Sequence, residues 1–122
     1  MNVSTQESLY LRLGGEPAVT AVVDALYRAV LGDERLRGYF AAVDIDQLKD
    51  HMAALLAQVL GGPAGYTGRE LHVAHLGLGI TAEHYDLVGA YLVGILAARG
   101  ADDDVLEAVR RILVSVAGDI VE

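Results

Sequence analysis

Apolar residues recur at helical spacing in four long stretches of the chain. In each stretch they fall at positions i, i+3, i+4 and i+7, which places them on one face of an α-helix. The pattern predicts amphipathic helices over residues 17–31, 44–60, 82–99 and 102–120. No stretch alternates apolar and polar residues as a half-buried strand does. We therefore expect an all-α fold with four substantial helices.

Capping residues and glycines mark the ends of these helices. Asp44 or Asp46 is suited to begin the second helix and Thr81 to cap the third, because short polar side chains accept hydrogen bonds from the first free N–H groups. Gly32 and Gly100 end the first and third helices. After Gly32, Asp33 can cap a short helical turn within a connector that ends in two aromatic residues.

The middle of the chain departs from this plan. Residues 61–68, GGPAGYTG, hold four glycines and a proline, which no regular helix tolerates. Residues 69–76 then fit a helix of about two turns, on which Leu71, His75 and Leu78 align. So short a helix leaves a gap beside its long neighbours. A flat apolar cofactor with one axial histidine, such as haem, would fill that gap.

Three of the four histidines, His72, His75 and His84, lie within residues 70–86. The fourth, His51, lies on the edge of the apolar stripe of residues 44–60, so we expect it to point at least half inward. The residues alone leave three interpretations open. The histidines are ordinary core residues bonded to backbone, or one binds haem iron, or His72 and His75 hold zinc with a third histidine.

Length and composition narrow the class of protein. The 122 residues suit one domain over residues 1–122, with a flexible segment at 1–8. The net charge of −8 and the scattered Lys and Arg residues exclude a nucleic-acid interface. The absence of cysteine excludes disulfides, iron–sulfur clusters and a thiolate nucleophile. No apolar run reaches the length of about 18 residues that a membrane span needs, and no signal peptide is present, so we expect a cytoplasmic protein.

Six motifs in order along the chain resemble the truncated, two-over-two haemoglobins of group I. They are LYLRLGGEPAV at 9–19, LYRAVL at 26–31, LRGYF at 36–40, LKDHM at 48–52, GGPAGYTGR at 61–69 and AHLGLGITAEHYD at 74–86. The resemblance covers nearly the whole chain. It implies a truncated globin fold, a two-over-two helical sandwich with a short proximal helix after the Gly-rich loop. It also implies haem b (iron protoporphyrin IX) as the cofactor.

The resemblance assigns roles to particular residues. It makes His75 the proximal haem ligand, Phe40 the aromatic residue on the haem face, and Tyr27 the distal residue whose hydroxyl hydrogen-bonds bound dioxygen. Tyr66 and Arg69 lie where a haem edge or propionate passes, and the Gly14-Gly15 and Gly61-Gly62 pairs loosen the chain around the ligand helix. The apolar wall is expected to comprise Leu48, Leu55, Leu56, Leu71, Leu78, Ile80 and Val88. His72 and His84 have no ligand role in the family pattern and are expected to be surface or structural residues.

Two neighbouring positions complicate this pattern. Met52 stands where many group I members carry glutamine, so the second hydrogen-bond donor to a bound gas is missing. His51 stands where some members place a histidine that occupies the sixth iron position. His51 therefore either makes bis-histidyl haem with His75, or turns outward and leaves the sixth position open.

The resemblance implies reversible binding of dioxygen, nitric oxide and carbon monoxide. It also suggests nitric-oxide dioxygenation or peroxidase-like chemistry, for which an external reductase is needed because the chain has no flavin or nicotinamide motif. The rival functions are a bis-histidyl haem protein for redox or gas sensing, and a helical interaction module without a cofactor. We expect a monomer or weak dimer.

Overall fold

The computed structural model describes residues 8–62 and 79–122, and every regular element in those ranges is a helix. The elements are α1 (Leu9–Leu13), α2 (Gly15–Leu31), the 3-10 helix η2 (Arg37–Phe40), α3 (Ile45–Val59), α5 (Ala82–Ala98) and α6 (Asp103–Ile120). The four long helices agree with the predicted ones within a few residues. None of the described helices has the length and apolar composition needed to cross a membrane.

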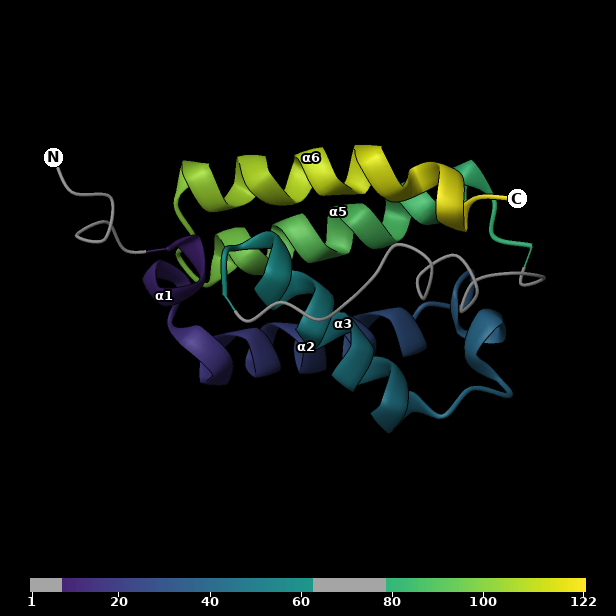
Figure 1. Ribbon diagram of the computed structural model, residues 1–122. Coiled ribbons are helices and arrows are strands. Elements are labelled where there is room, and N and C mark those ends of the chain that lie inside the picture. The colour runs from purple at the N-terminus through teal and green to yellow at the C-terminus, as the bar shows by residue number, and fades with distance from the viewer. Residues whose placement is uncertain (1–7, 63–78) are drawn as a thin grey trace, which may run out of the picture.

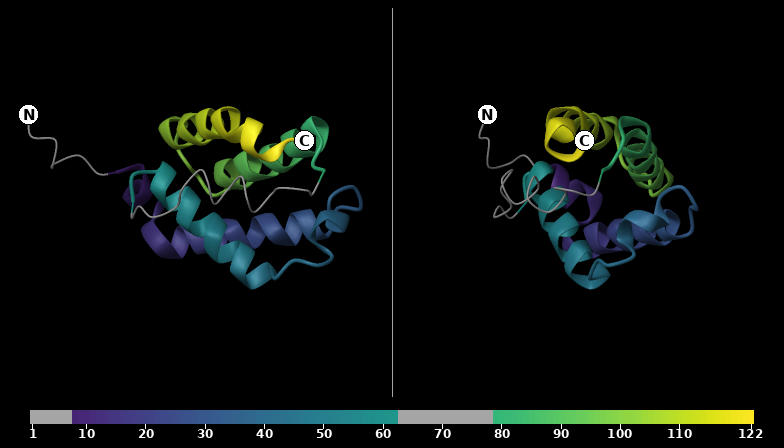
Figure 2. Two further views of the ribbon diagram at one scale, coloured as in Figure 1. Left: turned by 45° about the vertical axis from the view of Figure 1, so that its right-hand side comes forward. Right: turned by 90° about the vertical axis from the view of Figure 1, so that its right-hand side faces the viewer.

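The long helices form two pairs. α2 packs against α3, and α5 packs against α6, while α2 also contacts α5 and so joins the pairs. Figure 1 shows the α5–α6 pair above the α2–α3 pair, and the end-on view of Figure 2 shows the four helices around a common centre. This arrangement is the two-over-two sandwich that the family resemblance implied.

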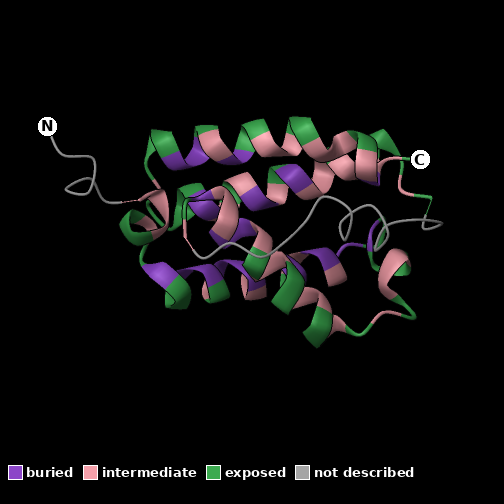
Figure 3. Ribbon diagram, viewed as in Figure 1, coloured by how far each residue is buried: buried purple, intermediate pink, exposed green. Residues whose placement is uncertain are grey.

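The core is centred on the inward face of α2. Val22, Leu26 and Val30 are fully buried there, and Leu96 of α5 and Val109 of α6 are equally buried on the opposite side. Figure 3 shows that the buried residues of these helices face the interior. Each such side chain stabilises the fold by about 1.5–3 kcal/mol relative to an exposed one.

Side-chain caps begin four of the helices. In each, the N-cap oxygen accepts a hydrogen bond from the backbone N–H three residues later, which satisfies a donor that the helix itself leaves free. The pairs are Ser8 with Leu11, Asp44 with Gln47, Thr81 with His84 and Asp102 with Val105. The cap of α3 is therefore Asp44, and Thr81 caps α5 as predicted.

The first long helix begins two residues before the predicted start at Pro17. The reason is the short helix α1, which ends at Leu13 and is separated from α2 by Gly14 alone. Gly14 has φ 127°, a conformation that other residues rarely adopt, and it serves as the C-cap of α1 and the N-cap of α2. A helix of five residues is too short to show a periodic pattern, so the sequence did not predict it.

The pair Gly61-Gly62 has a packing role that the sequence analysis did not foresee. A Cβ atom on Gly62 would lie 2.6–2.9 Å from three ring atoms of Tyr10. The backbone N–H of Tyr10 also donates to the carbonyl of Leu60 at 2.8 Å. Gly62 is therefore required for the contact between α1 and the end of α3, rather than only for a loose chain beside the predicted ligand helix.

A buried carboxylate ties the end of α2 to α5. Asp33 accepts hydrogen bonds from the Arg35 backbone N–H at 2.9 Å and the Arg35 guanidinium at 2.8 Å. It also accepts a bond from the Tyr91 hydroxyl at 2.7 Å. The Arg35 side chain, followed by the Tyr91 hydroxyl, holds the pKa of the Asp33 carboxyl well below its usual range. Asp33 thus caps the turn as predicted and also fixes α5 in place.

We predict that Asp33→Asn destabilises the protein at pH 7, with a fall in melting temperature on the order of 5 °C. The lowered pKa means that the ionised carboxylate stabilises the fold above the unfolded pKa of about 3.9. That contribution is lost as pH falls towards the folded-state pKa, so the difference between wild type and variant should shrink in acid. Thermal melts from pH 7 to pH 3 measure this, with Glu34→Gln, an exposed neighbouring carboxylate, as the control. An equal difference at every pH would contradict the role of the charge.

We predict opposite effects of alanine at two glycines. Gly62→Ala should lower the free energy of unfolding by about 1–3 kcal/mol, because the new methyl group collides with the Tyr10 ring. Gly94→Ala should raise it by about 0.5–1 kcal/mol, because Gly94 lies within α5 and nothing lies within 4 Å of the added atom. Urea unfolding, followed by circular dichroism, measures the free energy of unfolding of both variants and the wild type, all in the same haem state. If the two substitutions change this free energy equally, the Tyr10 contact is unimportant.

Candidate functional site

An apolar cavity lies between the two helix pairs. It has a volume of about 140 Å³ and is partly open to solvent. Its walls come from α2, η2, α3, α5, α6 and the segment before α5. The lining residues are Leu26, Tyr27, Tyr39, Phe40, Val43, Leu48, Met52, Leu55, Leu56, Val59, Ile80, Tyr85, Val88, Gly89, Leu92, Val109, Ile112, Leu113, Val116 and Ile120.

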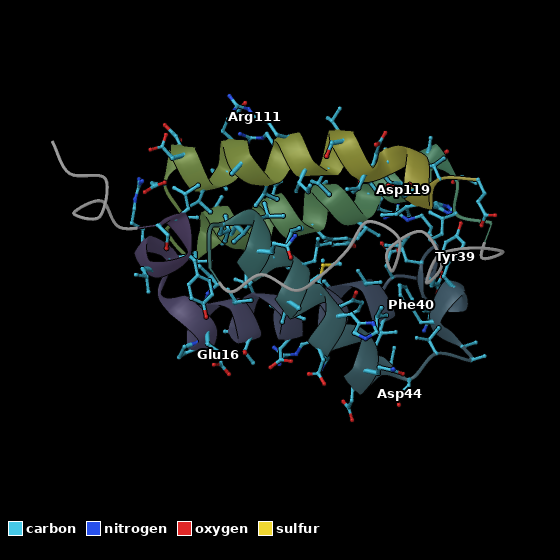
Figure 4. The ribbon with its side chains drawn as sticks, in the orientation of Figure 1. Glu16, Tyr39, Phe40, Asp44, Arg111 and Asp119 are labelled. Atoms are coloured by element: carbon cyan, nitrogen blue, oxygen red, sulfur yellow. The ribbon has the colours of Figure 1, made fainter. Side chains whose placement is uncertain are left out.

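Two aromatic residues form a fixed corner of the cavity. Tyr27 is only 4% exposed, and its ring meets that of Phe40 edge-to-face, with centroids 5.9 Å apart and planes at 83°. Tyr27 is held by α2, whereas Phe40 ends η2. Figure 4 shows Phe40 and Tyr39 at the same end of the molecule as Asp119 of α6. The corner therefore lies where η2 approaches the α5–α6 pair.

The structure brings together all but one of the predicted site residues that it describes. Those that line the cavity are Tyr27, Phe40, Leu48, Met52, Leu55, Leu56, Ile80 and Val88. The remaining predicted residues, Tyr66, Arg69, Leu71, His75 and Leu78, lie within residues 63–78, outside the described part of the chain.

His51 is the exception, and the expectation that it points at least half inward is wrong. Its side chain is exposed and does not line the cavity, whereas the next residue, Met52, does. The buried side of α3 is centred on Leu56 and Ala57. Position 51 lies about 140° around the helix from Leu56, so it faces away from the core. The apolar stripe placed His51 at the edge of the apolar face but did not show whether this edge faces the core or the solvent.

The zinc interpretation gains no support from the described histidines. His84 lies in the first turn of α5, where its Nδ1 atom is 2.5 Å from the Tyr39 hydroxyl, which fits the expected structural role. Within residues 8–62 and 79–122 no three His or carboxylate side chains are grouped as metal ligands. His72 and His75, on which the zinc interpretation depended, lie outside these ranges.

Two tyrosines complete the wall, and the sequence analysis did not assign them to the site. Tyr39 precedes Phe40 directly, and Tyr85 lies one turn before Val88 on the inward face of α5. The Tyr85 hydroxyl donates to the carbonyl of Leu113 on α6. Burial, with a smaller effect of the Asp86 charge, raises the pKa of Tyr85 to about 12. The position of Tyr39 beside Phe40 was the signal that could have identified it.

The chemistry of the wall fits a flat apolar group. Apart from backbone atoms, the polar atoms of the lining side chains are the hydroxyls of Tyr27, Tyr39 and Tyr85 and the sulfur of Met52. Among the described residues that line the cavity, none is charged. A polar or ionic ligand would lose its hydration here without recovering it. A porphyrin ring, in contrast, needs such apolar walls with a few hydroxyls near its centre or edge.

Comparison with known proteins agrees with this chemistry. The family model described as bacterial-like globin matches residues 8–122. The group 1 truncated hemoglobin GlbN of Mycolicibacterium paratuberculosis is 35% identical over 113 residues, covering 93% of this chain and 83% of the relative. GlbN of Synechocystis sp. is 37% identical over 106 residues, covering 84% of this chain and 86% of the relative.

Solved structures show the same fold. The crystal structure of truncated hemoglobin from Tetrahymena pyriformis, Fe(III) form, matches with a TM-score of 0.84 at 30% identity, covering 94% of this chain and 98% of that chain. The 2/2 hemoglobin from Synechococcus sp., in the cyanomet state with covalently attached heme, has a TM-score of 0.84 at 31% identity. The match covers 93% of this chain and 98% of that chain.

The helical fold and its apolar cavity are thus those of a globin. The chain belongs to the bacterial-like globins and, among them, to the group 1 truncated haemoglobins. It is a haem-binding protein whose cofactor is haem b, and oxygen binding follows from its family.

Proposed function

We propose that the protein binds dioxygen reversibly at haem iron and uses it to remove nitric oxide. The single observation that carries this proposal is the hydroxyl of Tyr27, a residue buried on α2 in a cavity whose described walls are mostly apolar. In the proposal, His75 holds the iron from the proximal side. Phe40 packs against the ring, and the leucines of α3 form the apolar wall.

The proposed role of Tyr27 follows from its surroundings. Tyr27 is buried on α2 and braced by the edge of the Phe40 ring, so its hydroxyl is held on a rigid element. A hydrogen bond from this hydroxyl stabilises a diatomic ligand that carries partial negative charge, because the apolar walls exclude competing water. Met52 lines the same cavity but has no donor to offer. Tyr27 is therefore the proposed stabilising donor.

In this proposal no side chain of the protein occupies the sixth iron position, so that gases can bind there. The exposed side chain of His51 supports an open position over bis-histidyl haem. When bound, haem would supply an iron that holds dioxygen, carbon monoxide or nitric oxide. That iron could also convert nitric oxide and dioxygen into nitrate, provided that a reductase outside this chain restores its ferrous state. The chain itself provides the dry cavity and the donor.

We predict that the protein takes up one haem per chain and that His75→Ala abolishes or strongly weakens uptake. Titration with haemin, followed by the Soret band, measures this. His72→Ala is the matched control, because His72 lies in the same short segment and has no ligand role in the proposal. A colourless protein, or a normal band in His75→Ala, would overturn it.

In the dithionite-reduced protein under nitrogen we expect one broad high-spin band. Split low-spin bands that vanish in His51→Ala would instead establish His51 as a ligand.

We predict that Tyr27→Phe speeds dioxygen release by about tenfold or more, because one hydrogen bond of about 1.4 kcal/mol corresponds to a factor of ten. Stopped-flow release of dioxygen from the ferrous protein measures the rate. Tyr10→Phe removes a hydroxyl from a ring outside the cavity and should release dioxygen at the wild-type rate. A change of less than twofold in Tyr27→Phe would show that the Tyr27 hydroxyl does not hold the gas.

A further inference from the structure

The side chains of Tyr39 and His84 join η2 to the start of α5. The Tyr39 hydroxyl and His84 Nδ1 are 2.5 Å apart, and the two rings also meet edge-to-face at 5.5 Å and 75°. The residues are 45 positions apart in the sequence. Both are partly buried, so the hydrogen bond is sheltered from competing water.

The pair lies at the rim of the cavity. Tyr39 lines the cavity beside Phe40, whereas His84 stands behind the wall and is flanked by Ile80 and Tyr85, which do line it. Figure 4 shows Tyr39 and Phe40 together on η2, at the end of the molecule that Asp119 also marks. The hydrogen bond therefore connects the α2–α3 side of the cavity to its α5–α6 side.

The two partners differ in how firmly they are held. His84 lies in the first turn of a long helix, and its backbone N–H donates to the Thr81 cap at 3.2 Å. Tyr39 belongs to a 3-10 helix of four residues that packs chiefly on α2. Short 3-10 helices have poorer hydrogen-bond geometry than α-helices. The bond to His84 thus fixes a wall residue on the less rigid element to a rigid one.

We propose that the Tyr39–His84 hydrogen bond is a latch that retains haem, in which His84 acts as a positioning residue for Tyr39. The proposal rests on the proposed haem site. A flat ring enclosed by apolar side chains leaves only when part of its wall moves, and the Tyr39–His84 hydrogen bond ties the Tyr39 side of the wall to α5. Breaking the bond lowers the barrier for that movement.

The test is the rate at which the ferric holoprotein loses haem to an excess of apomyoglobin. Tyr39→Phe keeps the ring and removes the hydroxyl, and we expect haem loss about two- to tenfold faster, the effect of one ordinary hydrogen bond. His84→Ala should give a similar increase. The double variant should be no faster than the single ones, because both substitutions break the same bond. Additive effects would contradict the latch.

Three further measurements separate the latch from a general loss of stability. His84→Asn places an amide near the Nδ1 position and should restore slow haem loss, while Tyr10→Phe should behave as wild type. Circular dichroism should show unchanged helix content in each variant. In the haem-free protein, Tyr39→Phe should shift the ¹⁵N resonance of His84 Nδ1, which detects the bond without haem.

The outcomes also distinguish the two proposals. If His75→Ala takes up and retains haem like wild type, the proposed haem site fails. If His75→Ala fails to bind haem but Tyr39→Phe and His84→Ala release haem at the wild-type rate, the haem site stands and the latch is refuted.

Discussion

The packing of α2 against both α3 and α5 is the constraint on which the rest of the structure depends. α2 contacts both helix pairs, so the rotation of α2 about its axis decides which of its side chains fill the core and which face the cavity. Val22 and Val30 are fully buried, and Leu26 reaches the cavity wall. Tyr27, the next residue, therefore brings a hydroxyl to the cavity without leaving the buried face.

The position of α5 requires directional bonds in addition to apolar packing. This helix carries apolar residues around most of its circumference, and burial of apolar area does not specify a direction. Three polar contacts supply that direction. They join His84 to η2, Tyr85 to α6, and Tyr91 to the turn after α2. Because the three contacts lead to three different elements, they fix the rotation and height of α5 beside the cavity.

Local rules were sufficient to predict the long helices and two of their caps. Asp44, one of two candidates, and Thr81 act within one turn of their own position, so their roles are readable from the chain. The apolar side chains of α3 that line the cavity also follow from spacing. The exposure of His51 did not, because it depends on which side of α3 packs against α2. The Tyr39–His84 contact joins distant segments, and no local pattern contains it.

The composition of the cavity wall also limits which ligands the protein can hold. Burying an ion without a partner costs far more than burying a neutral molecule, and the wall residues in 8–62 and 79–122 include no charged side chain. Neutral diatomic gases therefore enter at little cost, whereas anions are disfavoured. Among neutral gases, a hydroxyl on a rigid helix favours the one that becomes most polarised on binding. In the proposed function, the apolar wall would thus select by charge and Tyr27 by polarity.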